Sequence, residues 1–189
     1  MSRMAPLLEN NDWSTHGFTP VPLGVPKAQV LLVTCLDHRL DPARMFGLEP
    51  GDAPVIRNAG GRVTDTVLTD IAYLGFLAGA VFSVEGPLFE VAVIHHTQCG
   101  TGFLADTDFR DRAADATGVS PQTLAASKVD DPAVTVAEDV ERLLTSPLLP
   151  RGATVSGHVY DVETGRVTMV VSAREPATTV PGSAIPNHD

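Results

Sequence analysis

Short apolar runs alternate along this chain with segments whose apolar residues recur at helical spacing. Three runs are bounded by turn-forming residues and predict buried strands, at residues 28–35, 53–56 and 91–94. Their nearly continuous apolar character is typical of strands covered on both faces of a parallel sheet. Two later runs, 154–162 and 166–171, flank Glu163-Thr164-Gly165. This pattern predicts a hairpin and therefore an antiparallel strand at one edge.

Helical patterns occupy the intervals between the predicted strands. Asp41 before Pro42 is typical of a helix cap followed by the first helical residue. Thr64 can cap a longer helix that extends to about Gly79. This longer helix is apolar almost all round, so we expect it to lie between the sheet and a second subunit.

The region after residue 102 is less regular. Residues 103–114 have weak helical character, and the polar stretch 115–133, interrupted by Pro121 and Pro132, predicts a surface excursion. Thr135-x-x-Glu138 has the form of a capping box. The box predicts that the next helix begins at Thr135.

The alternation of strands and helices predicts the fold class and the domain boundaries. We expect an α/β domain over residues 28–172, with a mainly parallel central β-sheet, flanking helices and an antiparallel edge strand. Residues 1–27 contain four prolines, which disfavour a continuous helix, and they predict an arm laid over a neighbouring surface. Residues 173–189 predict a loose C-terminal tail.

Composition narrows the classes of partner. The 189 residues are 43% hydrophobic and carry a formal net charge of −10, which argues against nucleic acid and against anionic membrane surfaces. No apolar run approaches the roughly 20 residues of a membrane span. The first residues have no apolar core of the signal-peptide kind, so we expect a cytoplasmic location.

Metal-ligating side chains stand at the ends of two predicted strands. His96 and Cys99 follow the 91–94 run, and Cys35 ends the 28–35 run. Ligands of parallel sheets bind beyond the carboxyl ends of the strands, and thiolate and imidazole are both good zinc donors. The pattern indicates a zinc site. From the cysteine count alone, a disulfide or two buried thiols stay open as alternatives.

Two charged residues follow Cys35 closely. If Cys35 holds zinc, Asp37 comes within reach of the metal or of a water bound to it, and Arg39 can fork around the Asp37 carboxylate. The carboxylate can also complete a tetrahedron with Cys35, His96 and Cys99. The alternative is a solvated ion pair, worth no more than ~1 kcal/mol.

The combined pattern resembles the β-class carbonic anhydrases, in their small prokaryotic branch. Cys35-x-Asp37-x-Arg39 is followed by His96-x-x-Cys99-Gly, with Arg57-Asn58-Ala59-Gly60 between them, and the likeness covers roughly residues 30–171. The resemblance implies Zn2+ held by Cys35, His96 and Cys99. It implies reversible hydration of carbon dioxide by a zinc-bound hydroxide that the Asp37–Arg39 dyad orients. It also implies a homodimer or homotetramer assembled through N-terminal arms.

Two other functions compete with this one. A carbonyl sulfide or carbon disulfide hydrolase would use the same zinc site on a linear relative of carbon dioxide, with access set by residues 79–90. A non-catalytic zinc-stabilised binding module would keep Asp37 permanently on the metal, although such a module has no use for Arg39.

The remaining singled-out residues receive lesser roles. Strand alternation turns His95 away from His96, so we expect His95 to be structural. His38 is expected to be exposed at the rim of the site, and His158 to be packed or exposed on an edge strand. Gln98, between the two ligands, departs from the acidic or small residue expected in many relatives, which leaves the surroundings of the metal open.

Overall fold

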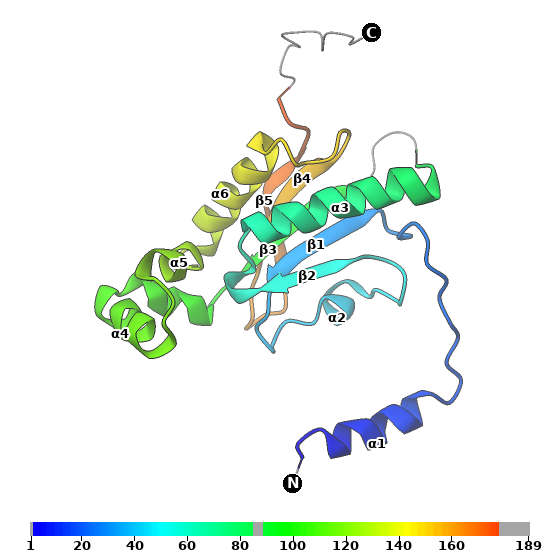
Figure 1. Cartoon of the computed structure of the whole chain (residues 1–189), viewed down its shortest axis with the longest axis horizontal. Helices are drawn as coiled ribbons and strands as arrows, with labels where there is room; N and C mark the ends of the chain where they lie inside the picture. The colour runs from blue at the N-terminus through cyan, green and yellow to red at the C-terminus, as the bar shows by residue number, and fades with distance from the viewer. Residues whose placement is uncertain (1, 85–88, 178–189) are drawn as a thin grey trace, which may run out of the picture.

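The protein is described by a computed structural model over residues 2–84 and 89–177. Within that part of the chain a five-stranded sheet has the order β2-β1-β3-β4-β5. The strands are β1 (Val30–Cys35), β2 (Val55–Asn58), β3 (Glu90–His96), β4 (Thr154–Tyr160) and β5 (Val167–Arg174). The first four are parallel, and β5 pairs with β4 in the antiparallel direction. The predicted fold class is confirmed (Figure 1).

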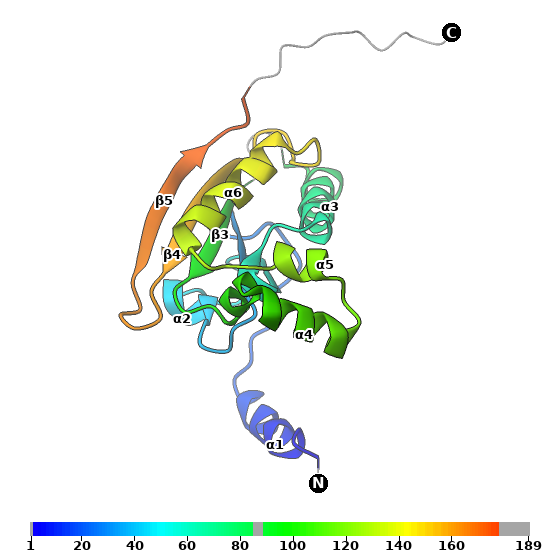
Figure 2. The same ribbon diagram turned by 90° about the vertical axis from the view of Figure 1, so that its left-hand side faces the viewer.

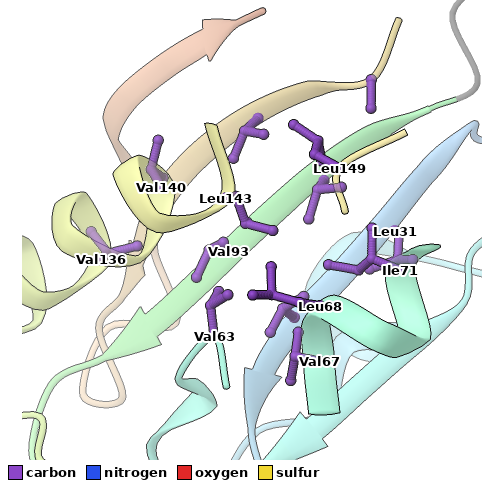
Figure 3. Close-up of a cluster of buried hydrophobic side chains, with 14 residues drawn as sticks. Leu31, Val63, Val67, Leu68, Ile71, Val93, Val136, Val140, Leu143 and Leu149 are labelled. Carbon is purple, nitrogen blue, oxygen red and sulfur yellow. The ribbon is translucent and has the colours of Figure 1, made fainter. Parts of the chain in front are cut away.

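Two helices, α3 (Asp65–Phe82) and α6 (Pro132–Thr145), cover one face of the sheet and form the main core. Side chains from both helices meet Val93 of β3 (Figure 3). In α6, Val136, Val140 and Leu143 are fully buried. Each such side chain contributes about 1.5–3 kcal/mol by leaving water. This core fixes the strands, and the strands fix the site at their carboxyl ends.

The opposite face of the sheet has a thinner cover. The short helix α2 (Pro42–Phe46) lies over it, and Met45 packs on a small cluster of Leu32, Ala92 and Ile94. Asp41 accepts a hydrogen bond from the Ala43 amide and Gly47 ends the helix in the left-handed conformation, so the predicted cap is confirmed.

Helix α3 is long and apolar, with a mean hydropathy of 1.4 over its 18 residues, and 22% of that stretch is buried. By length and composition alone it is able to cross a membrane, so the expectation that no apolar run comes near that length was too strict. Val67, Leu68 and Ile71 nevertheless pack into the core of the sheet. Tyr73 and Phe76 on the other side are 60% and 69% exposed, the surface for which we expected a partner subunit.

One predicted helix start was wrong, and the arm contains a helix that the sequence did not predict. Helix α6 begins at Pro132 with Asp131 as its cap, not at Thr135, because proline is well suited to the first helical position. The arm contains α1 (Ala5–Ser14), and its Pro6 lies in the first turn, where proline is tolerated. In Figures 1 and 2, α1 lies apart from the sheet at the end of an extended segment.

Three further differences concern extents. Helix α3 continues past its predicted end near Gly79 to Phe82, and residues 85–88 lie outside the described residues. The predicted surface excursion at 115–133 contains the end of α4 (Thr107–Thr117) and all of α5 (Pro121–Ala126). The strand β5 extends to Arg174, past the predicted domain end at residue 172.

Candidate metal centre

Cys35, His96 and Cys99 converge in a buried cluster at the carboxyl edge of the sheet. The strands β1 and β3 are parallel neighbours, with Thr34 opposite Ile94, so both strands end at the same edge. One donor atom from each of the three side chains lies within 4.8 Å of the other two, and all three residues are buried. The sequence therefore identified the three side chains that the fold brings together.

The turn after β3 points the imidazole of His96 into this cluster. His96 Nδ1 donates to the carbonyl oxygen of Thr97 at 2.9 Å, which leaves Nε2 as the free ligand atom. That Nε2 is buried and has no hydrogen-bond partner among the described residues. A buried nitrogen without a partner is costly unless a metal satisfies it. The observed donor set therefore fits a zinc ion.

The two thiols support the same conclusion. Both cysteines are free, and their Sγ atoms lie 3.9 Å apart, well beyond the length of a disulfide bond. Their mutual hydrogen bond raises the pKa of Cys35 and lowers the pKa of Cys99, so the pair shares one proton. A divalent cation stabilises both as thiolates. The Thr101 hydroxyl lies 3.1 Å from Cys99 Sγ and can donate a hydrogen bond to it.

Asp37 and Arg39 form a forked ion pair beside the donor cluster. Arg39 Nε and Nη2 donate to the two carboxylate oxygens of Asp37 at 3.0 and 2.7 Å. The backbone amide of Arg39 donates to the same carboxylate at 2.9 Å. The Asp37 side chain is only 13% exposed, and the Arg39 guanidinium holds the pKa of that carboxyl well below its usual range. Asp37 is thus kept ionised, with Oδ2 3.9 Å from His96 Nε2.

Arg57, near the end of β2, holds in place the loop that carries Asp37. Its Nε donates to the carbonyl of Cys35 at 3.0 Å, and its Nη2 donates to the carbonyls of Asp37 at 2.8 Å and Leu40 at 3.0 Å. Sequence reasoning noted Arg57 only as part of the family pattern and missed this role. An arginine at the end of a strand next to β1 was the one available signal.

The paired glycines after β2 let two backbones approach closely. Gly61 has φ +69°, and a Cβ there would lie 2.8 Å from the amide nitrogen of Cys35. Gly60 has φ +79°, and a Cβ there would lie 2.6 Å from the carbonyl oxygen of Ser127. The glycines therefore allow η1 (Ala59–Gly61) to lie against the end of β1. Asn58 uses its side-chain amide to donate to the Arg62 carbonyl at 2.8 Å.

His95 faces away from the cluster, which confirms the structural orientation predicted for it. Its Nδ1 lies 2.8 Å from the Thr135 hydroxyl, and its Nε2 lies 3.2 Å from Asp139. Arg62 Nε donates to the same Asp139 carboxylate at 2.8 Å. Burial acts to raise the pKa of Asp139, but the bonds from His95 and Arg62 hold it below its usual value. This buried network joins β3 to α6 directly behind the ligand turn.

Two further histidines, His38 and His158, lie outside the donor cluster. His38 is 94% exposed beside Asp37, with its Nδ1 3.8 Å from that carboxylate. His158 is half-buried on β4, which pairs with both β3 and β5, so the expectation that it lies on an edge strand was wrong. Its Nε2 is 2.9 Å from the Ser156 hydroxyl. Gln98 is exposed in the ligand turn, in the left-handed conformation with φ 54°.

Comparisons with known proteins agree with this geometry. A family model described as carbonic anhydrase matches residues 30–120. Beta-carbonic anhydrase 1 of Mycobacterium tuberculosis is 34% identical over 164 residues, covering 87% of this chain and 94% of that protein. A carbon disulfide hydrolase of Acidithiobacillus thiooxidans is 32% identical over 166 residues, covering 77% and 79%.

A solved structure of similar length gives the same result for the fold. The carbonic anhydrase of Streptococcus mutans superposes with a TM-score of 0.73 at 34% identity, covering 90% of this chain and 98% of that one. The agreement therefore spans almost the whole of both chains. The chain therefore belongs to the β-carbonic anhydrase family of lyases, which includes relatives that act as carbon disulfide hydrolases.

Proposed function

We propose that this protein catalyses the zinc-dependent, reversible hydration of carbon dioxide to bicarbonate. The observation that carries the proposal is the placement of an ionised, forked carboxylate next to a buried Cys-His-Cys donor set. Cys35, His96 and Cys99 would hold the metal. Zinc, when bound, lowers the pKa of a water molecule so that it can act as a nucleophile near neutral pH.

The side chains of the dyad then have distinct tasks. Asp37, ionised at neutral pH, accepts a hydrogen bond from the attacking oxygen and so aims its lone pair at the carbon of the substrate. Arg39 occupies both carboxylate oxygens and keeps Asp37 in place. Arg57 fixes the loop that carries both residues through three main-chain carbonyls.

Carbon disulfide or carbonyl sulfide hydrolysis is the second candidate. It is favoured by the 32% identity to the carbon disulfide hydrolase of Acidithiobacillus thiooxidans. Carbon disulfide and carbonyl sulfide are linear molecules with an electrophilic central carbon, so the same nucleophile and the same dyad would serve. Discrimination would then depend on access to the site rather than on its donor set.

Parallel assays of the purified, zinc-loaded protein test the proposal. We expect about one zinc per chain, as a single four-coordinate site requires, fast carbon dioxide hydration, and slow sulfide release from carbonyl sulfide and carbon disulfide. Fast sulfide release with negligible carbon dioxide hydration would assign the second function instead. Zinc at full occupancy without activity on any of the three substrates would favour the non-catalytic binding module.

We further propose that the functional unit is a homodimer or homotetramer in the cytoplasm. The exposed apolar side of α3 supports the assembly, as do Leu7 and Leu8 of α1, which are 56% and 59% exposed. The mass in solution, measured by light scattering at several concentrations, tests the assembly. A monomer at micromolar concentration would contradict it. Fractionation of cells tests the location.

A further inference from the structure

The hairpin between β4 and β5 contacts the turn that carries His96 and Cys99. The amide of Thr97 donates to the Tyr160 carbonyl at 3.0 Å. The Thr97 hydroxyl accepts from the Val162 amide at 3.1 Å. Gln98 Nε2 donates to Glu163 Oε1 at 2.6 Å. Two of these bonds involve main-chain groups, but the third joins two side chains that are 65 residues apart.

Glu163 is held ready for this contact by its own turn. The Asp161 carboxylate accepts from the amides of Glu163 at 2.8 Å and Thr164 at 3.4 Å. The amide of Gly165 donates to the Asp161 carbonyl at 2.8 Å, which closes the tip of the hairpin. The position of the Glu163 carboxylate therefore follows from a structured turn and not from a free loop.

Gln98 connects this turn to the dyad through its backbone. Arg39 Nη2 donates to the Gln98 carbonyl at 2.9 Å while it also donates to Asp37 Oδ2 at 2.7 Å. The backbone of Gln98 is in the left-handed conformation, with φ 54°. Residues other than glycine adopt this conformation rarely. The bond from its side chain to Glu163 offsets that cost. A continuous chain of contacts therefore leads from Glu163 through Gln98 and Arg39 to Asp37.

From this chain of contacts we propose that Gln98 and Glu163 are positioning residues that hold the Asp37 carboxylate in the fork of Arg39 and away from the fourth ligand position. Asp37 Oδ2 lies 3.9 Å from His96 Nε2, so a small movement brings the carboxylate to a metal held by the cluster. Carboxylates are competent zinc ligands, and one in that position competes with any exogenous ligand. The inference rests on the proposed metal site. It adds that Gln98 and Glu163 determine how accessible the fourth ligand position is to other ligands.

Anion binding to the cobalt(II)-substituted protein tests the proposal without an activity assay. Azide competes with Asp37 for the fourth position, and the absorption bands of cobalt report its binding. An apparent affinity falls in proportion to the fraction of molecules that are competent to bind. For Glu163→Ala we expect azide binding to weaken about three- to fivefold, fivefold being equivalent to about 1 kcal/mol. We expect kcat/KM for carbon dioxide to fall by a similar factor.

The design separates a positioning role from a simple charge effect. Removing a negative charge near the site strengthens the binding of an anion, so a pure charge effect has the opposite sign in Glu163→Ala. Glu163→Gln keeps an acceptor oxygen for Gln98 and is expected to restore azide affinity to within about twofold of the wild type. Thr164→Ala, in the same turn but without contact to Gln98 in the structure, is the matched control.

Two outcomes would overturn the proposal. One is azide binding in Glu163→Ala that equals or exceeds that of the wild type. The other is an equal loss in Glu163→Gln, because that variant keeps the hydrogen bond. The azide titration needs only a bound metal. If the wild type bound azide and failed to hydrate carbon dioxide, the function would be wrong while the role of Gln98 and Glu163 could still be judged.

Discussion

The two strand ends that form the site are fastened in different ways. The end of β1 and the loop after it supply one donor, Cys35, together with both members of the dyad, and Arg57 holds this loop through three main-chain carbonyls. The end of β3 and the turn after it supply two donors, and the hairpin after β4 holds this turn through one main-chain bond and two bonds that involve polar side chains. In the proposed function, two of the three zinc donors therefore come from the β3 side, whereas the whole dyad comes from the β1 side.

This difference separates the residues expected to set the affinity for zinc from the residues expected to set the reaction rate. A change in the turn should remove the metal, and a change in the loop should leave the metal and remove the activity. A change behind the turn at Asp139 should then lower mainly the stability, and a change behind the loop at Arg57 should lower mainly the rate. Four variants test this division, from the largest expected effect to the smallest.

Cys99→Ser tests the metal-binding side of the comparison by removing one donor thiol. Serine is a far weaker zinc donor than a thiolate, so we expect the variant to lose most of its zinc and about 10³-fold or more of its activity. Metal analysis after dialysis and a carbon dioxide hydration assay check this. The core under α3 and α6 should keep the far-ultraviolet circular dichroism spectrum unchanged. Full zinc retention would contradict the assignment of Cys99.

Asp37→Ala tests the loop side of the comparison. We expect zinc at the wild-type level but kcat/KM reduced by about 10²- to 10³-fold, because the attacking oxygen loses its hydrogen-bond partner. His38→Ala is the matched control, since its side chain is 94% exposed. If Asp37→Ala retained zinc and full activity, the role given to the dyad would be wrong.

Asp139→Asn tests the support behind the turn. Asp139 is 2% exposed and pairs with Arg62 and His95, so its loss should reduce the free energy of unfolding at pH 7 by about 3 kcal/mol. The folded-state pKa of Asp139 is depressed, so its contribution is present above the unfolded pKa of about 3.9. That contribution is lost as the pH falls through the folded-state value.

Urea unfolding of the wild type and Asp139→Asn between pH 7 and pH 3.5 measures this difference. The gap between the two proteins should be constant near neutrality and shrink below about pH 4. Glu138→Gln removes the exposed partner of the same Arg62 and should change stability by no more than about 0.5 kcal/mol. If the difference in unfolding free energy between the two proteins grew as the pH fell, the assigned direction of the Asp139 pKa shift would be wrong.

Arg57→Lys tests the support of the dyad loop and should have the smallest effect. A lysine ammonium lacks the planar fork and cannot reproduce all three carbonyl contacts. We expect a fall in kcat of about tenfold with zinc retained, because a small misplacement of the dyad lowers the rate. Arg44→Lys, an exposed change on α2, is the control. Loss of zinc in Arg57→Lys would show that Arg57 supports metal binding and not only the dyad.

Local pattern predicted most of the elements but failed where two signals competed. Thr135-x-x-Glu138 satisfied the capping-box rule, yet Asp131 with Pro132 begins α6 one turn earlier. Thr135 is then free inside the helix to contact His95 at 2.8 Å. The prolines of the arm concealed α1, because the helix contains Pro6 in its first turn and ends before the later prolines. In each case the sequence contained the residues that begin the helix, but the local pattern did not indicate where the helix begins.

The sequence by itself determined the donor set, the dyad and the order of strands and helices. Thiolate, imidazole and carboxylate chemistry belongs to single side chains, and the spacing of Cys35, Asp37 and Arg39 is local. Only the tertiary structure decided what supports them. Arg57, Asp139 and Glu163 act on the site across separations of 17 to 77 residues. Strand order and register create those contacts, and no local pattern encodes either.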